Sequence, residues 1–214
     1  MSFFTNQQTQ DYLLSLYSNP NEFLQNLRKN AEERKIPIIT RDTEQMINTL
    51  LTLKNPQKML ELGTAIGYSS INFAKTCGDL YITTIDYNED HVKEARENIQ
   101  KVGLTERITV LYGDAKELLD QIEDTYDVIF IDAAKGQYQY FFDHSLNKLK
   151  PRGLIISDNV LYKGLIAAND LSERRQRSIV KRMREYLEYL THHTAFETTV
   201  LPIGDGVAVS AKKD

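Results

Sequence analysis

Residues 59–69 read MLELGTAIGYS, a short apolar run that leads into a turn with two glycines. The run Met59–Leu62 has the length of a buried strand. Gly63 and Gly67 let the backbone approach a ligand closely, because glycine has no Cβ. Their spacing, Glu-x-Gly-x-x-x-Gly, differs from the Gly-x-Gly-x-x-Gly turn that seats a pyrophosphate on a helix N-terminus. The stretch therefore predicts a strand followed by a ligand-binding turn, and it disfavours a dinucleotide.

Working outward from this turn, four more apolar runs alternate with helical stretches, at residues 81–85, 108–111, 128–131 and 154–156. Strands separated by helices predict a parallel sheet with helices on both faces. After a helix over residues 172–193, the runs Phe196–Leu201 and Gly206–Ala211 are joined by only four residues, which predicts an antiparallel hairpin. The expected fold is α/β, a mostly parallel seven-stranded sheet with a C-terminal antiparallel hairpin. This is the arrangement of Rossmann-like class I methyltransferases.

Residues 1–55 have the apolar spacing of helices, over 6–17, 21–35 and a third that Thr40 or Asp42 would cap. Asn55-Pro56 should end the third helix. We expect a single domain over residues 1–214, in which 1–55 form an N-terminal helical cap and 56–214 form the catalytic core.

Composition excludes several classes of protein. The 26 Lys and Arg against 30 Asp and Glu give a net charge of −4, which argues against a general nucleic-acid-coating protein but permits a local basic patch. Cys77 is the single cysteine, so no internal disulfide can form. Neither a signal peptide nor an apolar run of about 18 residues is evident. These features predict a cytoplasmic protein with no membrane partner.

Each predicted parallel strand ends in a carboxylate or a glycine turn, and ligands of open α/β sheets bind at that edge. Any single acidic residue there could be only a turn former or a cap. Asp86, after the second strand, is placed to bind ribose hydroxyls. With the glycine spacing and the hairpin, this favours S-adenosylmethionine, with Glu61 near its cationic methionine end and Asp114-Ala115 beside the adenine.

A second group of polar residues follows the fourth and fifth strands. Asp132, Asp158 and Asn159 offer the hard oxygen donors that suit Mg²⁺, although Asp158 and Asn159 could merely cap a turn. Lys135 follows Asp132 by three residues. A loop lysine is commonly a solvated charge, but beside a metal it could lower the pKa of a hydroxyl or accept its proton.

These residues carry a family resemblance. Glu61–Ser69, Asp86, Asp132–Lys135 and Asp158-Asn159 resemble the cation-dependent O-methyltransferases of the catechol and caffeoyl-CoA type. The resemblance implies that Asp132, Asp158 and Asn159 hold Mg²⁺ and that Lys135 is catalytic. It implies a cofactor site comprising Ile39, Glu61, Gly63, Ser69, Asp86, Asp114, Ala115 and Asp132, with Ile39 contributing through its backbone.

A narrower resemblance concerns the substrate. Residues 130–138, 158–164 and 202–206 are similar to a bacterial branch that methylates 5-hydroxyuridine to 5-methoxyuridine at wobble position 34 of tRNA. A catechol and 5-hydroxyuridine both offer a metal two adjacent oxygens, so either substrate suits the same chemistry. An anticodon loop supplies the unstacked nucleotide that such a pocket requires.

A basic stretch near the end of the chain bears on this choice. Four cations recur at three and four residues on one helix face: Arg174, Arg177, Lys181 and Arg184. They could contact a tRNA backbone, or they could be a solvated face. The main hypothesis is the tRNA O-methyltransferase, with the anticodon loop as partner and a homodimer as assembly. The alternatives are a small-molecule catechol-type enzyme and a non-catalytic tRNA-binding protein.

Overall fold

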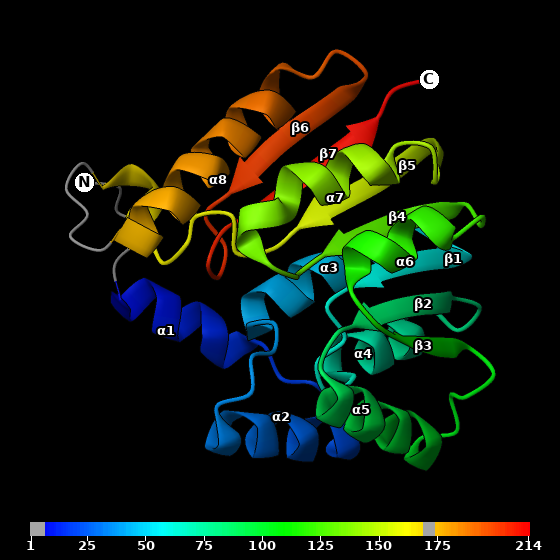
Figure 1. The fold of residues 1–214 in the computed structure, drawn as a ribbon. Helices are drawn as coiled ribbons and strands as arrows, with labels where there is room; N and C mark the ends of the chain where they lie inside the picture. The colour runs from blue at the N-terminus through cyan, green and yellow to red at the C-terminus, as the bar shows by residue number, and fades with distance from the viewer. Residues whose placement is uncertain (1–6, 169–173) are drawn as a thin grey trace.

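The computed structural model describes residues 7–168 and 174–214 and contains one seven-stranded sheet (Figure 1). The strand order is β3-β2-β1-β4-β5-β7-β6. The strands are β1 (Lys58–Leu62), β2 (Tyr81–Asp86), β3 (Ile108–Tyr112), β4 (Tyr126–Ile131), β5 (Leu149–Ser157), β6 (Phe196–Leu201) and β7 (Val207–Lys212). The first five pair in parallel, and β7 is antiparallel to both β5 and β6. The predicted sheet and hairpin are confirmed.

Only the fifth strand differs clearly from its expected length. β5 begins at Leu149, five residues before the apolar run at 154, and its pairing with β4 shifts between Tyr126 and Val128. The extra residues include Pro151, Arg152 and Gly153, of which the first two are exposed. A polar, proline-containing segment does not show the apolar pattern from which a strand is predicted.

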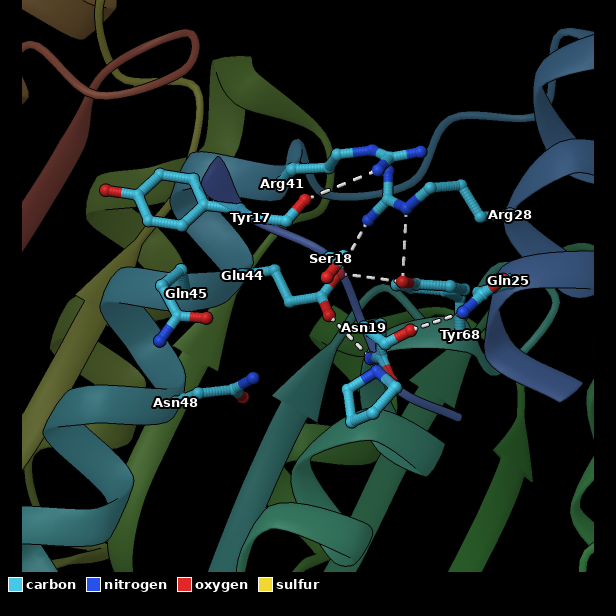
Figure 2. A pocket seen from close by; sticks show the side chains of 11 residues that line it. Tyr17, Ser18, Asn19, Gln25, Arg28, Arg41, Glu44, Gln45, Asn48 and Tyr68 are labelled. Atoms are coloured by element: carbon cyan, nitrogen blue, oxygen red, sulfur yellow. Dashed lines mark hydrogen bonds and ion pairs between the residues drawn. The ribbon is translucent and has the colours of Figure 1, made fainter. Parts of the chain in front are cut away.

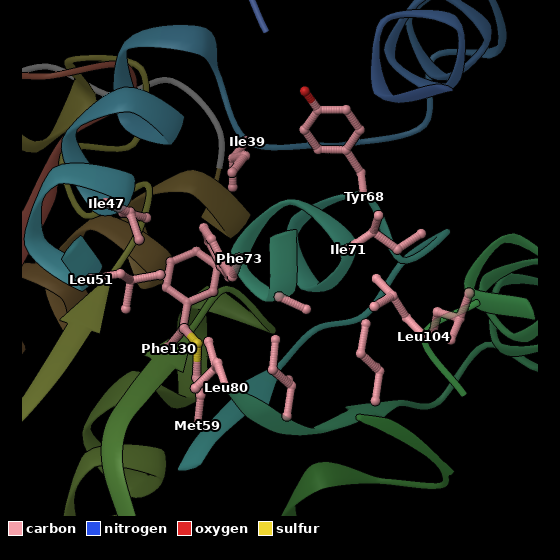
Figure 3. Close-up of a cluster of buried hydrophobic side chains, with 14 of the residues drawn as sticks. Ile39, Ile47, Leu51, Met59, Tyr68, Ile71, Phe73, Leu80, Leu104 and Phe130 are labelled. Carbon is pink, nitrogen blue, oxygen red and sulfur yellow. The ribbon is translucent and has the colours of Figure 1, made fainter. Parts of the chain in front are cut away.

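Helices cover both faces of the sheet and create two hydrophobic cores. One face carries α2 (Glu22–Arg34), α3 (Arg41–Lys54), α4 (Tyr68–Thr76) and α5 (Glu89–Lys101). Figure 3 shows part of this core, where the rings of Phe73 and Phe130 meet edge to face at 5.6 Å. The other face carries α6 (Ala115–Gln121), α7 (Tyr138–Ser145) and α8 (Arg174–His192). Two short 3-10 helices, η1 (Lys135–Gln137) and η2 (Leu165–Ala167), follow β4 and β5.

The predicted helix ends have identifiable causes. Asn21 caps α2 by accepting from the Leu24 amide, and Lys35 ends it in a left-handed conformation. Asn55 ends α3 in the same way. In the last predicted helix, Ser172 and Glu173 lie outside the described residues, and α8 begins at Arg174.

The first helix, α1 (Gln7–Leu16), stays on the surface. None of its residues is buried, and Tyr12, Leu13 and Leu16 are exposed. Its apolar stripe therefore does not join the core of this chain. Among residues 7–168 and 174–214, no helix is both long enough and apolar enough to cross a membrane.

Candidate active site

The carboxyl ends of the parallel strands are fixed to one another by backbone hydrogen bonds that continue one residue past each strand. The Gly63 amide donates to the Ile85 carbonyl at 2.9 Å, and the Asp132 amide donates to the Leu62 carbonyl at 2.9 Å. The Asp158 amide donates to the Ile131 carbonyl at 3.0 Å. Three of the residues predicted to bind ligands, Gly63, Asp132 and Asp158, therefore lie side by side at the carboxyl edge of the sheet.

Gly63 shows how tightly this edge is packed. Its φ is +109°, and a Cβ at this position would lie 2.0 Å from the carbonyl oxygen of Asp132. Only glycine fits a conformation and a contact of this kind. The ligand-binding turn after β1 is thus pressed directly against the first residue after β4.

Glu61 is buried at the end of β1 and anchors the helix that follows the turn. Its carboxylate accepts hydrogen bonds from the hydroxyls of Ser69, at 2.5 Å, and Ser70. Burial raises the pKa of Glu61 to about 7. The two predicted cofactor residues Glu61 and Ser69 are therefore in contact, and together they fix the start of α4.

Asp86 joins two loops. One of its carboxylate oxygens accepts from the Ala65 amide at 2.8 Å, and the other accepts from the Asn88 amide at 2.9 Å. Each oxygen keeps a second lone pair for a ligand hydroxyl. Asp114 is exposed and caps α6 through the Lys116 amide, and Ala115 is the first residue of that helix.

The predicted metal donors and the predicted catalytic lysine lie together. The Nζ atom of Lys135 donates to Oδ1 of Asn159 at 2.8 Å. Asn159 has a φ of +55°, and its backbone N–H donates to Oδ1 of the buried Asp158 at 2.6 Å. Burial raises the pKa of Asp132 and of Asp158, and the charge of Asp132 raises the pKa of Asp158 further.

This arrangement fits a hard divalent cation. Two neighbouring carboxylates, of which Asp158 is buried and Asp132 is half-buried, favour a positive charge between them, and Lys135 offsets part of their repulsion. The described residues contain no group of three His, Cys, Asp or Glu side chains that could hold a metal. The set here instead combines two carboxylates with the amide oxygen of Asn159, which suits Mg²⁺ better than zinc.

A polar network that the sequence did not predict connects the N-terminal helices to this site (Figure 2). The buried guanidinium of Arg28 donates to the Ile39 carbonyl at 3.0 Å, to Glu44 at 2.7 Å and to the Tyr68 hydroxyl at 3.1 Å. The Tyr68 hydroxyl donates in turn to Glu44 at 2.7 Å. Tyr68 is the first residue of α4, and Ile39 is a predicted cofactor contact. The network therefore fixes two sides of the expected cofactor pocket.

The four predicted cations of α8, Arg174, Arg177, Lys181 and Arg184, are exposed. The Arg184 guanidinium also donates to the carbonyls of Ile166, at 2.8 Å, and Ala168, at 2.6 Å. Arg184 thus supports the segment around η2, which follows the metal donors in sequence.

A Rossmann-like sheet with this set of residues at its carboxyl edge defines a class I methyltransferase. Residues 14–213 match the family described as O-methyltransferase, and the chain belongs to that family.

Named relatives agree with this assignment. The chain is 32% identical to caffeoyl-CoA O-methyltransferase 2 of Populus trichocarpa, over 91% of this chain and 83% of that protein. It is 29% identical to catechol O-methyltransferase of Niastella koreensis, over 94% and 95% of the two chains.

Two crystal structures are similar as well. A Staphylococcus aureus protein provisionally described as a caffeoyl-CoA O-methyltransferase has a TM-score of 0.91 and 36% identity, over 96% of this chain and 100% of that one. A Bacillus cereus O-methyltransferase in complex with S-adenosylhomocysteine has a TM-score of 0.83 and 25% identity, over 96% and 97%.

Proposed function

We propose that this protein is a cation-dependent O-methyltransferase that uses S-adenosylmethionine and acts on a substrate with two adjacent oxygens. The observation that carries the proposal is the contact between Lys135 Nζ and Asn159 Oδ1 at 2.8 Å, beside the carboxylates of Asp132 and Asp158. A possible catalytic base and a set of hard oxygen donors thus share one position at the edge of the sheet.

The cofactor proposal rests on the turn after β1 and on Asp86. Gly63 lets the turn after β1 pack directly against Asp132, and Asp86 offers carboxylate lone pairs at the end of β2. The Bacillus cereus relative, which was crystallised with S-adenosylhomocysteine, supports the same cofactor here. S-adenosylmethionine would supply the methyl group.

The chain's own residues then position the substrate and handle one proton. Asp132, Asp158 and Asn159 would hold Mg²⁺, whose chemistry is to bind the two oxygens and lower the pKa of the reacting hydroxyl. The Lys135 ammonium stabilises the oxyanion that results, or as a free amine it accepts the proton. Its bond to Asn159 keeps Nζ within reach of that oxygen.

Two substrates satisfy this chemistry. A catechol or caffeoyl-CoA-type substrate is favoured by the names of the relatives from Niastella koreensis and Populus trichocarpa. 5-Hydroxyuridine in the anticodon loop of tRNA is the second candidate, favoured by the exposed cations Arg174, Arg177 and Lys181 on α8. A non-catalytic tRNA-binding role is less well supported, because such a protein would not need the Lys135 and Asn159 arrangement.

The assembly proposed for the protein is a homodimer. The exposed apolar side chains Tyr12, Leu13 and Leu16 of α1 could form a symmetric contact between two copies. Light scattering at micromolar concentration measures this directly, and a monomer mass there would contradict the dimer.

A direct assay tests the proposed reaction. Purified protein is incubated with labelled S-adenosylmethionine, Mg²⁺ and either catechol, caffeoyl-CoA or a tRNA stem–loop that contains 5-hydroxyuridine. Asp158→Ala and Asn159→Ala are expected to abolish transfer while leaving S-adenosylmethionine binding nearly unchanged, because Asp86 and the turn after β1 are untouched. Full activity in excess EDTA would contradict the role of the cation. Nucleoside mass spectrometry of tRNA from cells that lack the protein separates the two substrates.

A further inference from the structure

We propose that Lys116 and Arg182 form a phosphate-binding subsite beside Lys135, which takes a phosphate group of the substrate that is being methylated. This proposal rests on the function proposed above and specifies it further. The substrate that fits is not a bare phenol or nucleoside but one that carries a phosphate near its reactive ring.

The subsite is a small cavity of about 200 Å³ where three segments of the chain meet. Lys116 comes from α6, Arg182 and Glu185 come from α8, and residues 135–140 form the remaining wall. Three of these residues are cationic and one is anionic. The Oε1 atom of Glu185 lies 3.8 Å from the Nζ atom of Lys181, which is not part of the cavity lining. This ion pair partly offsets the negative charge of Glu185. The balance of charge therefore favours an anion.

Arg182 is oriented toward the catalytic segment. Its Nη1 atom donates to the Gly136 carbonyl at 3.3 Å, and a Cβ on Gly136 would lie 3.2 Å from the same atom. The absence of a side chain at Gly136 therefore allows the guanidinium to lie against the residue that follows Lys135. Within the described part of the chain this single hydrogen bond leaves most of the guanidinium donors for a ligand, and their fork suits a phosphate.

Lys116 is held at the cavity by an aromatic ring instead of by a carboxylate. Its Nζ atom lies 4.9 Å from the centroid of Tyr140, which is within the range of a cation–π contact. The imidazole of His144 stacks on the Tyr140 ring at 3.8 Å and also contacts Asp120 at 2.7 Å. No ion pair of Lys116 is formed within residues 7–168 and 174–214, so its ammonium is left for an anionic ligand.

The position of the cavity limits where the phosphate can lie in the substrate. Lys135 lines the cavity and also contacts Asn159, so an anion bound there would lie close to the reacting oxygen. Arg and Lys together recognise phosphate through a bidentate fork and a point charge. An RNA strand presents such a group through the phosphate that flanks the modified nucleotide, whereas the pantetheine arm of a coenzyme A thioester holds its phosphates far from the ring that is methylated.

Two substrates that differ only in a phosphate test the subsite: the nucleoside 5-hydroxyuridine and its 3′-phosphate. In the wild-type protein we expect kcat/KM to be about tenfold higher for the 3′-phosphate, which corresponds to about 1.4 kcal/mol.

The variants Arg182→Ala and Lys116→Ala should each lose most of this preference. Arg182→Lys should restore only part of it, because the charge returns without the fork. Lys101→Ala is the matched control, since it removes an exposed cation from α5, beside the opposite edge of the sheet, and should keep the wild-type ratio. Equal kcat/KM for the nucleoside and its 3′-phosphate, in a wild-type protein that turns both over, overturns the subsite and leaves the methyltransferase function intact.

A binding measurement keeps the subsite testable if neither compound is methylated. Inorganic pyrophosphate is titrated into the wild-type protein and into Arg182→Ala by calorimetry, with no turnover involved. Binding by the wild type that weakens about tenfold in the variant supports the subsite even if the proposed function fails. No difference between wild type, Arg182→Ala and the Lys101→Ala control contradicts it.

Discussion

Replacing Gly63 with alanine should damage the active site far more than a typical glycine substitution, because two separate costs combine there. The new Cβ would lie 2.0 Å from the Asp132 carbonyl oxygen, whereas real contacts stay beyond 3.0 Å. The ends of β1 and β4 must therefore move apart by about 1 Å, a displacement that can reduce a catalytic rate roughly 100-fold. The residue that moves is Asp132, which belongs to the donor set.

Stability should fall as well. Alanine at a φ of +109° costs roughly 1–3 kcal/mol. Separating the strands weakens the hydrogen bond from the Asp132 amide to the Leu62 carbonyl, which adds roughly 1–3 kcal/mol if the groups stay buried. For a chain of this size the melting temperature should fall on the order of 10 °C. The assays are thermal unfolding and methyl transfer at a temperature where the variant is still folded.

Gly103→Ala is the matched control. Gly103 also has a positive φ, +68°, but a Cβ there would meet nothing within 4 Å. This variant has the conformational cost without the clash. We expect it to lose about 1 kcal/mol of unfolding free energy, which lowers the melting temperature by about 2–4 °C, and to keep the wild-type kcat. The reasoning is refuted if folded Gly63→Ala keeps wild-type kcat, or if Gly103→Ala loses as much activity.

Three further predictions concern other parts of the molecule. If α8 lies along a tRNA backbone, the double variant Arg177→Ala/Lys181→Ala should reduce the slope of log affinity against log salt concentration by roughly 1.4 to 1.8. An unchanged slope in a tRNA-binding titration would mean that this face of α8 is solvated and does not contact tRNA. Tyr68→Phe removes the hydroxyl that connects Arg28 and Glu44. The KM for S-adenosylmethionine should therefore rise several-fold while kcat stays nearly constant. A fall in kcat with no change in KM would contradict this positioning role. The raised pKa of Glu61, about 7 against an ordinary 4.5, means that the folded state favours the neutral acid. The stabilisation from neutral Glu61 should be present below pH 4.5 and should be lost as the pH rises through about 7. The free energy of unfolding should therefore fall by about 3 kcal/mol relative to that of Glu61→Gln across this range. Denaturant unfolding measures both proteins, and an equal pH dependence of the two free energies would contradict the prediction.

The sequence by itself determined the strands, their parallel pairing and the edge at which the ligand-binding residues meet. Apolar runs of three to five residues, separated by helical stretches, leave few alternatives to a parallel sheet. Once that sheet is assumed, Glu61, Asp86, Asp132 and Asp158 must lie at one edge, because the carboxyl ends of parallel strands coincide. The short connection at 202–205 determined the hairpin in the same local way.

Only the tertiary structure decided which side chains act together. Arg28, Glu44 and Tyr68 are separated by 16 and 24 residues, so no local spacing relates them, and their contacts depend on how α2, α3 and α4 pack. On α8 the spacing predicted a basic face that includes Arg184, but not what Arg184 contacts. Packing placed Arg184 against the Ile166 carbonyl, and it placed Arg182, which lies outside that predicted face, against the Gly136 carbonyl. Periodicity fixes which residues share a face, whereas the partner of that face depends on contacts between residues far apart in the chain.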